Sequence, residues 1–141
     1  MWAVFRPQPR KRRGRLAALS DALRYEDAAR LRDRIEAVED IARRLRRLER
    51  LRASELVLLA PAVEPGFRRA VFVAGGRVAA VRTLPPGGGA TLELEAGIAA
   101  CRGLEPSYAP EHADELLLVA SFLRRPPPEL SVLPLSEARA A

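Results

Sequence analysis

Hydrophobic residues recur at intervals of three and four along residues 14–53, which is the spacing of one face of an α-helix. A first, short stripe contains Leu16, Leu19 and Leu23. After Arg24-Tyr25, a longer stripe continues without a Pro or Gly and comprises Leu31, Ile35, Val38, Ala42 or Ile41, Leu45, Leu48 and Leu51. Because the connection at Arg24-Tyr25 is short, the two predicted helices must run antiparallel. A two-helix hairpin cannot bury the whole of either stripe, so apolar surface remains for a third element.

The residues after 54 change to short apolar runs separated by turn-forming residues, which is typical of strands. Glu55–Ala60 predicts one strand. Ala70–Ala74 and Arg77–Leu84 flank Gly75-Gly76, and two glycines between β-branched runs predict a β-hairpin. Leu130–Leu133 predicts a last strand.

Two helices are expected between these strands. Ala90–Arg102 is the weaker of the two because it contains Gly97. Glu111–Arg125 has Pro110 in front of it, acidic residues in its opening turns and arginines at its end, which match the helix dipole. The predicted fold is therefore α+β: a basic arm (1–13), an antiparallel helical hairpin (14–53) and a small α/β layer domain with a β-hairpin (54–141).

Charge is distributed unevenly along the 141 residues. Residues 1–53 contain 16 basic and 8 acidic residues, net +8, whereas residues 54–141 contain 8 and 10, net −2. Since Lys11 is the only lysine, the preference for arginine reflects residue usage, and only the charge bears on function. Several acids precede a base by four residues, and Glu39–Arg43 and Asp40–Arg44 are expected to pair on the exposed helix face.

The basic run near the N-terminus predicts non-specific contact with nucleic-acid phosphates. Trp2 and Phe5 lie close enough in sequence to stack on unpaired bases. A solvated arm without a ligand is the alternative interpretation. The candidate nucleic-acid-binding residues are Arg10, Lys11, Arg12, Arg13 and Arg15.

Residues 16–35 carry the pattern L-x-x-L-x-x-A-L-x-[FY]-E-x-A-A-x-L-R-D-x-I, which resembles the UVR motif. That motif is the short helical hairpin through which the UvrB and UvrC subunits of bacterial nucleotide excision repair contact each other. The resemblance implies a partner-binding surface at the hairpin tip and in the step of small residues after it. Carried over to this chain, that surface comprises Tyr25, Glu26, Ala29, Leu31, Arg32, Asp33 and Ile35.

The order of elements after the hairpin is also similar to UvrC-like proteins, where a strand, a β-hairpin, an acidic helix and a Pro-rich turn follow. The nuclease parts of that family are not found. A GIY-YIG nuclease needs paired tyrosines, and this chain has only Tyr25 and Tyr108 in other contexts. The sequence ends before the acidic cluster of the second nuclease would begin. The resemblance therefore implies a protein that is not an enzyme and has no cofactor.

Other candidate chemistry is weak. His112 is the single histidine, and a surface or capping role is favoured over that of a general base or metal ligand. Cys101 is the single cysteine, which excludes an internal disulfide and a cysteine metal cluster. Gly87-Gly88-Gly89 lacks the Lys and Ser or Thr of a phosphate-binding loop. No catalytic or metal-binding residue is predicted.

The expected function is docking of a non-catalytic UVR-domain protein on UvrB or another UVR-bearing partner in DNA excision repair. Two alternatives stay open: an adaptor or regulator of a Clp-type chaperone or protease, and the regulatory end of a split GIY-YIG nuclease. Self-association of the hairpin into a homodimer is a further alternative. Without an apolar run of membrane-spanning length or a signal sequence, the chain is expected to be cytoplasmic.

Overall fold

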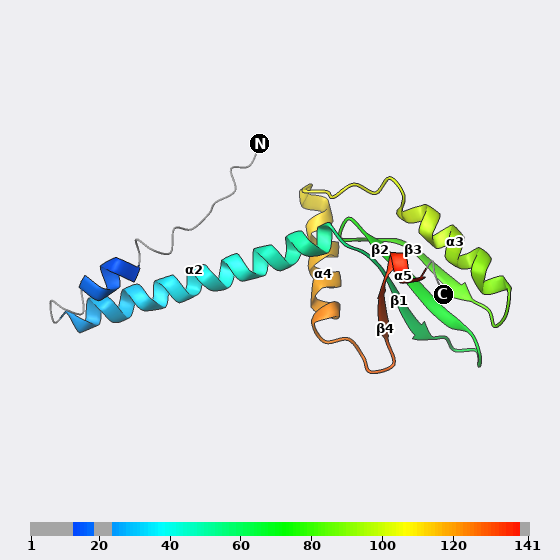
Figure 1. The fold of residues 1–141 in the computed structure, drawn as a ribbon, viewed down its shortest axis with the longest axis horizontal. Coiled ribbons are helices and arrows are strands. Elements are labelled where there is room, and N and C mark those ends of the chain that lie inside the picture. The colour runs from blue at the N-terminus through cyan, green and yellow to red at the C-terminus, as the bar shows by residue number, and fades with distance from the viewer. Residues whose placement is uncertain (1–12, 19–23, 139–141) are drawn as a thin grey trace. The chain divides into compact units, whose positions relative to one another are not determined.

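The computed structural model describes residues 13–18 and 24–138. The chain divides into two compact units, Met1–Leu45 and Arg46–Ala141, and the division falls inside the longest helix. Figure 1 follows the elements in chain order. Helices and an antiparallel sheet are both present, which confirms the predicted α+β class.

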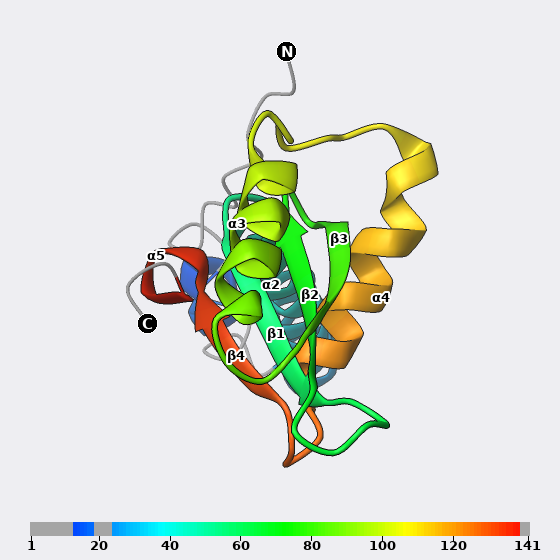
Figure 2. The same cartoon turned by 90° about the vertical axis from the view of Figure 1, so that its right-hand side faces the viewer.

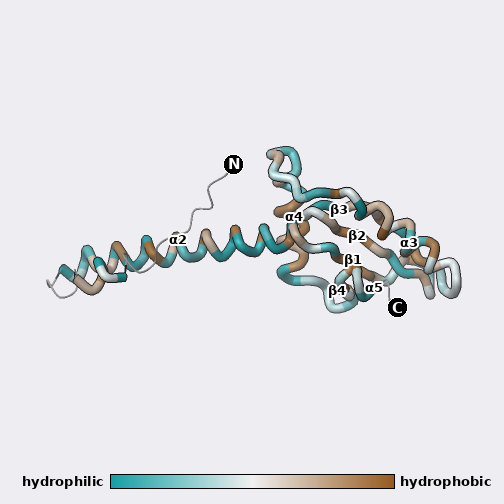
Figure 3. Tube along the Cα trace, turned by 45° about the horizontal axis from the view of Figure 1, so that its top comes forward, coloured by the Kyte–Doolittle hydropathy of each residue, from teal (hydrophilic) through white to brown (hydrophobic). Residues whose placement is uncertain are grey.

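In the first unit, residues 13–18 are helical and are followed by α2 (Tyr25–Arg52), of which residues 25–45 belong to this unit. Glu26 and Asp27 occupy the first turn of α2 and Arg50 and Arg52 the last, as the helix dipole favours. Figure 3 shows hydrophilic and hydrophobic residues alternating along α2, the pattern of an amphipathic helix. Of the two residues predicted to connect the helices, Tyr25 already belongs to α2, whereas Arg24 lies directly before it.

The two helical segments of the first unit lie side by side. The guanidinium of Arg13 is 3.7 Å from the carboxylate of Glu39. Arg15, two residues further on, lines a hollow together with Leu31 and Arg34 of α2. From residue 13 to residue 15 of the first segment, the neighbouring residues on α2 change from position 39 to positions 31 and 34. Residue numbers that rise on one helix and fall on the other indicate antiparallel helices. Leu19 and Leu23 lie outside the described residues.

The second unit contains a four-stranded antiparallel sheet of order β3-β2-β1-β4. Its strands are β1 (Glu55–Pro61), β2 (Arg68–Ala74), β3 (Arg77–Leu84) and β4 (Ser131–Pro134). Gly75 and Gly76 have positive φ angles of 62° and 77°, so the turn between β2 and β3 is one that glycine permits most easily. All four predicted strands are therefore confirmed, with ends that differ by at most a few residues.

The predicted helices of this unit are confirmed as well. They are α3 (Gly89–Cys101) and α4 (Ala113–Arg124), the latter preceded by a 3-10 turn, η1 (Pro110–His112). A short helix that was not predicted, α5 (Leu135–Ala138), follows β4 directly. Four residues are too few to show helical periodicity in a sequence.

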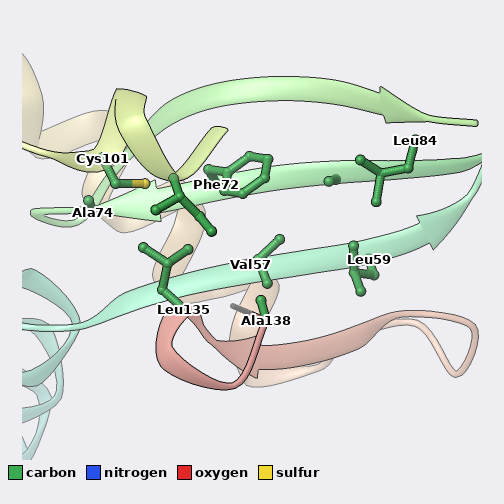
Figure 4. Packing of buried hydrophobic residues seen from close by; sticks show 10 residues of the cluster. Val57, Leu59, Phe72, Ala74, Leu84, Cys101, Leu135 and Ala138 are labelled. Carbon is green, nitrogen blue, oxygen red and sulfur yellow. The ribbon is translucent and has the colours of Figure 1, made fainter. Parts of the chain in front are cut away.

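Both faces of the sheet are covered by helices. On one face, Val57, Leu59 and Phe72 pack with Ile98 and Cys101 of α3 and with Leu135 and Ala138 of α5 (Figure 4). On the other face, Leu58 and Val73 pack with Leu116 and Val119 of α4 and with Leu51 from the last turn of α2. Figure 2 shows the sheet between α3 and α4. Successive residues of β1 point to opposite faces, so its nearly continuous apolar run contributes to both cores.

Candidate partner-docking surface

The first three turns of α2 present a continuous exposed face. At 100° per residue, five of the seven candidate docking residues fall on one side of the helix. All five are exposed in the structure, and Tyr25 retains 64% of its accessible surface. We call this the motif face; it consists of Tyr25, Glu26, Ala29, Arg32 and Asp33.

The other two candidate residues lie on a different side of α2. Leu31 and Ile35 are half-buried, and Ala28, one turn before Leu31, is buried with 2% of its surface exposed. A small residue at this point permits close approach of a neighbouring chain segment. The structure therefore separates the candidate set into the motif face and two residues that continue the inward stripe of the helix.

The inward stripe is not fully covered further along α2. Val38 and Ala42 are half-buried, so Ala42 rather than Ile41 continues the stripe. Ile41 and Leu45 expose 57% and 56% of their surface. Large aliphatic side chains on this helix thus remain available for contact, as expected for a hairpin too narrow to bury both of its stripes.

The basic arm is described only in part. Arg13 and Arg15 are exposed, and Arg13 is engaged with Glu39. Arg10, Lys11 and Arg12 lie outside the described residues, as do Trp2 and Phe5.

The structure also brings Arg15 together with three arginines that were not predicted to take part in binding. A hollow of about 340 Å³ lies between the helical segment 13–18 and α2. We call it the arginine hollow. Its lining contains four arginines, one acid and one aliphatic residue: Arg15, Arg24, Arg30, Arg34, Asp27 and Leu31. The spacing of Arg30 and Arg34 could have indicated a shared helix side, but the addition of Arg15 depends on the antiparallel packing.

The ion pairs on α2 differ from those expected. Asp40 pairs with Arg43, three residues on, rather than with Arg44. Glu39 faces Arg13 of the first helical segment instead of Arg43. The expected i,i+4 pairs were therefore wrong at both acids, because three-residue spacing also places side chains together on a helix and because Glu39 has a partner across the hairpin.

In the second unit, His112 is tied to two side chains. Its Nδ1 lies 2.8 Å from the Ser107 hydroxyl, and its Nε2 lies 3.2 Å from a guanidinium nitrogen of Arg77. Since an arginine can only donate, Nε2 accepts and Nδ1 carries the proton that is donated to Ser107. Both ring nitrogens are thus engaged: the Arg77 contact joins the segment before α4 to the start of β3, and the Ser107 contact lies within that segment.

Tyr108 forms a second polar contact in the same segment. Its hydroxyl donates a hydrogen bond of 2.9 Å to Glu49, whose other oxygen is 2.6 Å from Arg52. The Arg52 guanidinium lies 4.6 Å from the centre of the Tyr108 ring. The hydrogen bond to Glu49, followed by the negative charge of that carboxylate, raises the pKa of Tyr108.

Cys101 is enclosed in the core between α3 and the sheet. Burial, with a smaller contribution from the charge of Glu55, raises the pKa of its thiol. A thiol kept protonated in this way is a poor nucleophile. Within residues 13–18 and 24–138, no three His, Cys, Asp or Glu side chains are grouped as metal ligands. None of the helices described is both long and apolar enough to cross a membrane.

Comparison with known protein families finds a match that lies within the first unit. The family described as the UvrB/uvrC motif (UVR) matches residues 15–41. The matched segment contains the motif face, the arginine hollow and Ile41, and it covers less than half of the chain. No curated protein and no solved structure matches the chain at a significant level. The chain thus carries a UVR motif, which supports a role in protein interaction of the UvrB/UvrC type.

Proposed function

We propose that this chain is a non-catalytic docking protein that binds UvrB or another UVR-bearing protein in DNA excision repair. The observation that carries the proposal is the UVR match over residues 15–41, because the same residues present the motif face to solvent. An exposed tyrosine next to charged residues is a combination enriched at protein interfaces.

Absence of catalysis is part of the same proposal. The sequence lacks the paired tyrosines of a GIY-YIG nuclease. His112, the residue most suited to proton transfer, uses both ring nitrogens for contacts within the fold. These features support a protein that acts by bringing other molecules together.

The test compares UvrB binding by two double variants of the full chain. Tyr25→Ala with Arg32→Glu alters the motif face at two exposed positions, so folding should be preserved. Leu118→Ala with Arg44→Glu is the matched control, because both positions are exposed and lie outside residues 15–41. Circular dichroism verifies that helix content is the same in all proteins.

Size-exclusion chromatography with light scattering should show a defined complex between the wild-type chain and UvrB from the same cell. Loss of a buried interface tyrosine and reversal of a charge should together weaken binding by at least tenfold, roughly 1.4 kcal/mol or more. The control should bind within about twofold of wild type, a change of roughly 0.4 kcal/mol. Equal binding by both variants would reject the motif face, and wild-type chain that ignores UvrB but binds a Clp-type ATPase would favour the adaptor alternative.

A further inference from the structure

The arginine hollow gathers positive charge on a side of α2 that differs from the motif face. With 100° per residue, Arg30 and Arg34 of α2 are centred roughly 120° from the motif-face residues around the helix. Arg15 reaches the same hollow from the antiparallel segment 13–18. The hollow is therefore a separate feature of the first unit, whichever protein binds to the motif face.

The charges in the hollow are not balanced by its own lining. Asp27 is the single acid among the six lining residues, and it pairs with Arg24. Arg30 and Arg34 are four residues apart on α2, an arrangement in which like charges repel and destabilise a helix. An anion placed among these guanidinium groups would relieve that repulsion and accept several charge-assisted hydrogen bonds.

We propose that the arginine hollow binds a backbone phosphate of a nucleic acid. Arg15, which lines the hollow, is the last cation of a run of basic residues in the sequence that begins at Arg10. A nucleic acid carries regularly spaced phosphates that can meet several cations at once, whereas a phosphorylated side chain offers a single phosphate. Since the motif face lies on a different side of α2, a protein partner and a nucleic acid can bind at the same time.

The experiment measures binding of a fluorescently labelled duplex oligonucleotide to the full chain by anisotropy, over a range of salt concentrations. Arg30→Gln with Arg34→Gln removes two charges from the hollow while keeping residues of good helix propensity. Arg124→Gln with Arg125→Gln removes the same net charge from two exposed positions at the end of α4. UvrB binding is measured for the same three proteins.

If Arg30 and Arg34 together hold one backbone phosphate, the log–log salt slope should become shallower by about 0.9 in the hollow variant. Between about 50 mM and about 200 mM salt, wild-type affinity should then fall roughly 3.5-fold more than that of the hollow variant. The control should keep the wild-type slope, and the hollow variant should keep its affinity for UvrB.

Two results would overturn the inference. Equal weakening by the hollow variant and the control would mean that net charge alone attracts the oligonucleotide. Loss of UvrB binding in the hollow variant, with oligonucleotide binding unchanged, would assign the arginines to the protein partner. Failure of wild-type chain to bind UvrB would count against the proposed function only, because the oligonucleotide measurement does not depend on it.

Discussion

Replacement of Gly97 by alanine tests how closely α3 packs on the sheet. A Cβ atom at this position would lie less than 3.0 Å from three carbons of the Phe72 ring, and Phe72 is completely buried. On an open helix, Gly→Ala stabilises by about 1 kcal/mol. Here the added methyl must displace either α3 or the ring, and such overpacking costs about 1–3 kcal/mol. Because the ring has no exposed side toward which to move, we take about 3 kcal/mol as the cost of overpacking. Subtracting the helix stabilisation of about 1 kcal/mol leaves an expected net loss of about 2 kcal/mol.

The assay is urea denaturation followed by circular dichroism, with Gly88→Ala as the matched control. Gly88 directly precedes α3 with a φ of −64°, and a Cβ there would meet no atom within 4 Å. This control should leave the free energy of unfolding unchanged or raise it by up to about 1 kcal/mol. A Gly97→Ala protein at least as stable as wild type would refute the packing argument.

A double variant makes the test more specific. Phe72→Leu shortens the side chain that a methyl group at position 97 would strike. Combined with Gly97→Ala, it should destabilise the protein by less than the sum of the two single changes, because the residues are in contact. Strict additivity would show that the two positions do not share the space between α3 and β2.

Two further predictions concern titratable groups. Near neutral pH, Cys101 should react with a thiol reagent much more slowly in the folded chain than in urea, because burial raises its pKa and covers the sulfur; equal rates would contradict its place in the core. Tyr108→Phe should lower the Tm below about pH 10, because the hydrogen bond from the protonated phenol to Glu49 is lost. Because the pKa of Tyr108 is raised in the folded chain, the stabilisation by this hydrogen bond is fully present below the ordinary pKa of tyrosine and is lost as pH rises through the folded pKa. A difference in Tm between wild type and Tyr108→Phe that does not change with pH would refute the assignment.

Local signals in the sequence predicted most elements of the fold. Gly75-Gly76 predicted the turn between β2 and β3. Pro110 and the acidic residues after it predicted where the helical segment of η1 and α4 begins. These features act through the conformation of a few consecutive residues, so they can be recognised without knowledge of the rest of the chain.

Features that depend on distant residues were not predictable in the same way. The sequence identified Gly97 as a weak point of α3, whereas the structure shows that Phe72 requires a residue without a side chain there. The apolar run of β1 fits burial on both faces, but which helix covers which face follows only from packing. Arg15 joins the arginine hollow through the antiparallel arrangement of two helical segments.

The turn between β2 and β3 also determines where the protein can be modified. Hairpin tips are usually solvent-exposed and tolerate inserted sequence. Here Gly75 and Gly76 are buried; a side chain on Gly75 would meet the backbone of Glu105, and one on Gly76 would meet Leu116 of α4. The connection from β1 to β2 is different, because Val63 is fully exposed. An epitope or a fluorescent reporter therefore belongs in residues 63–66, where the sheet and both of its helical layers can assemble around it undisturbed.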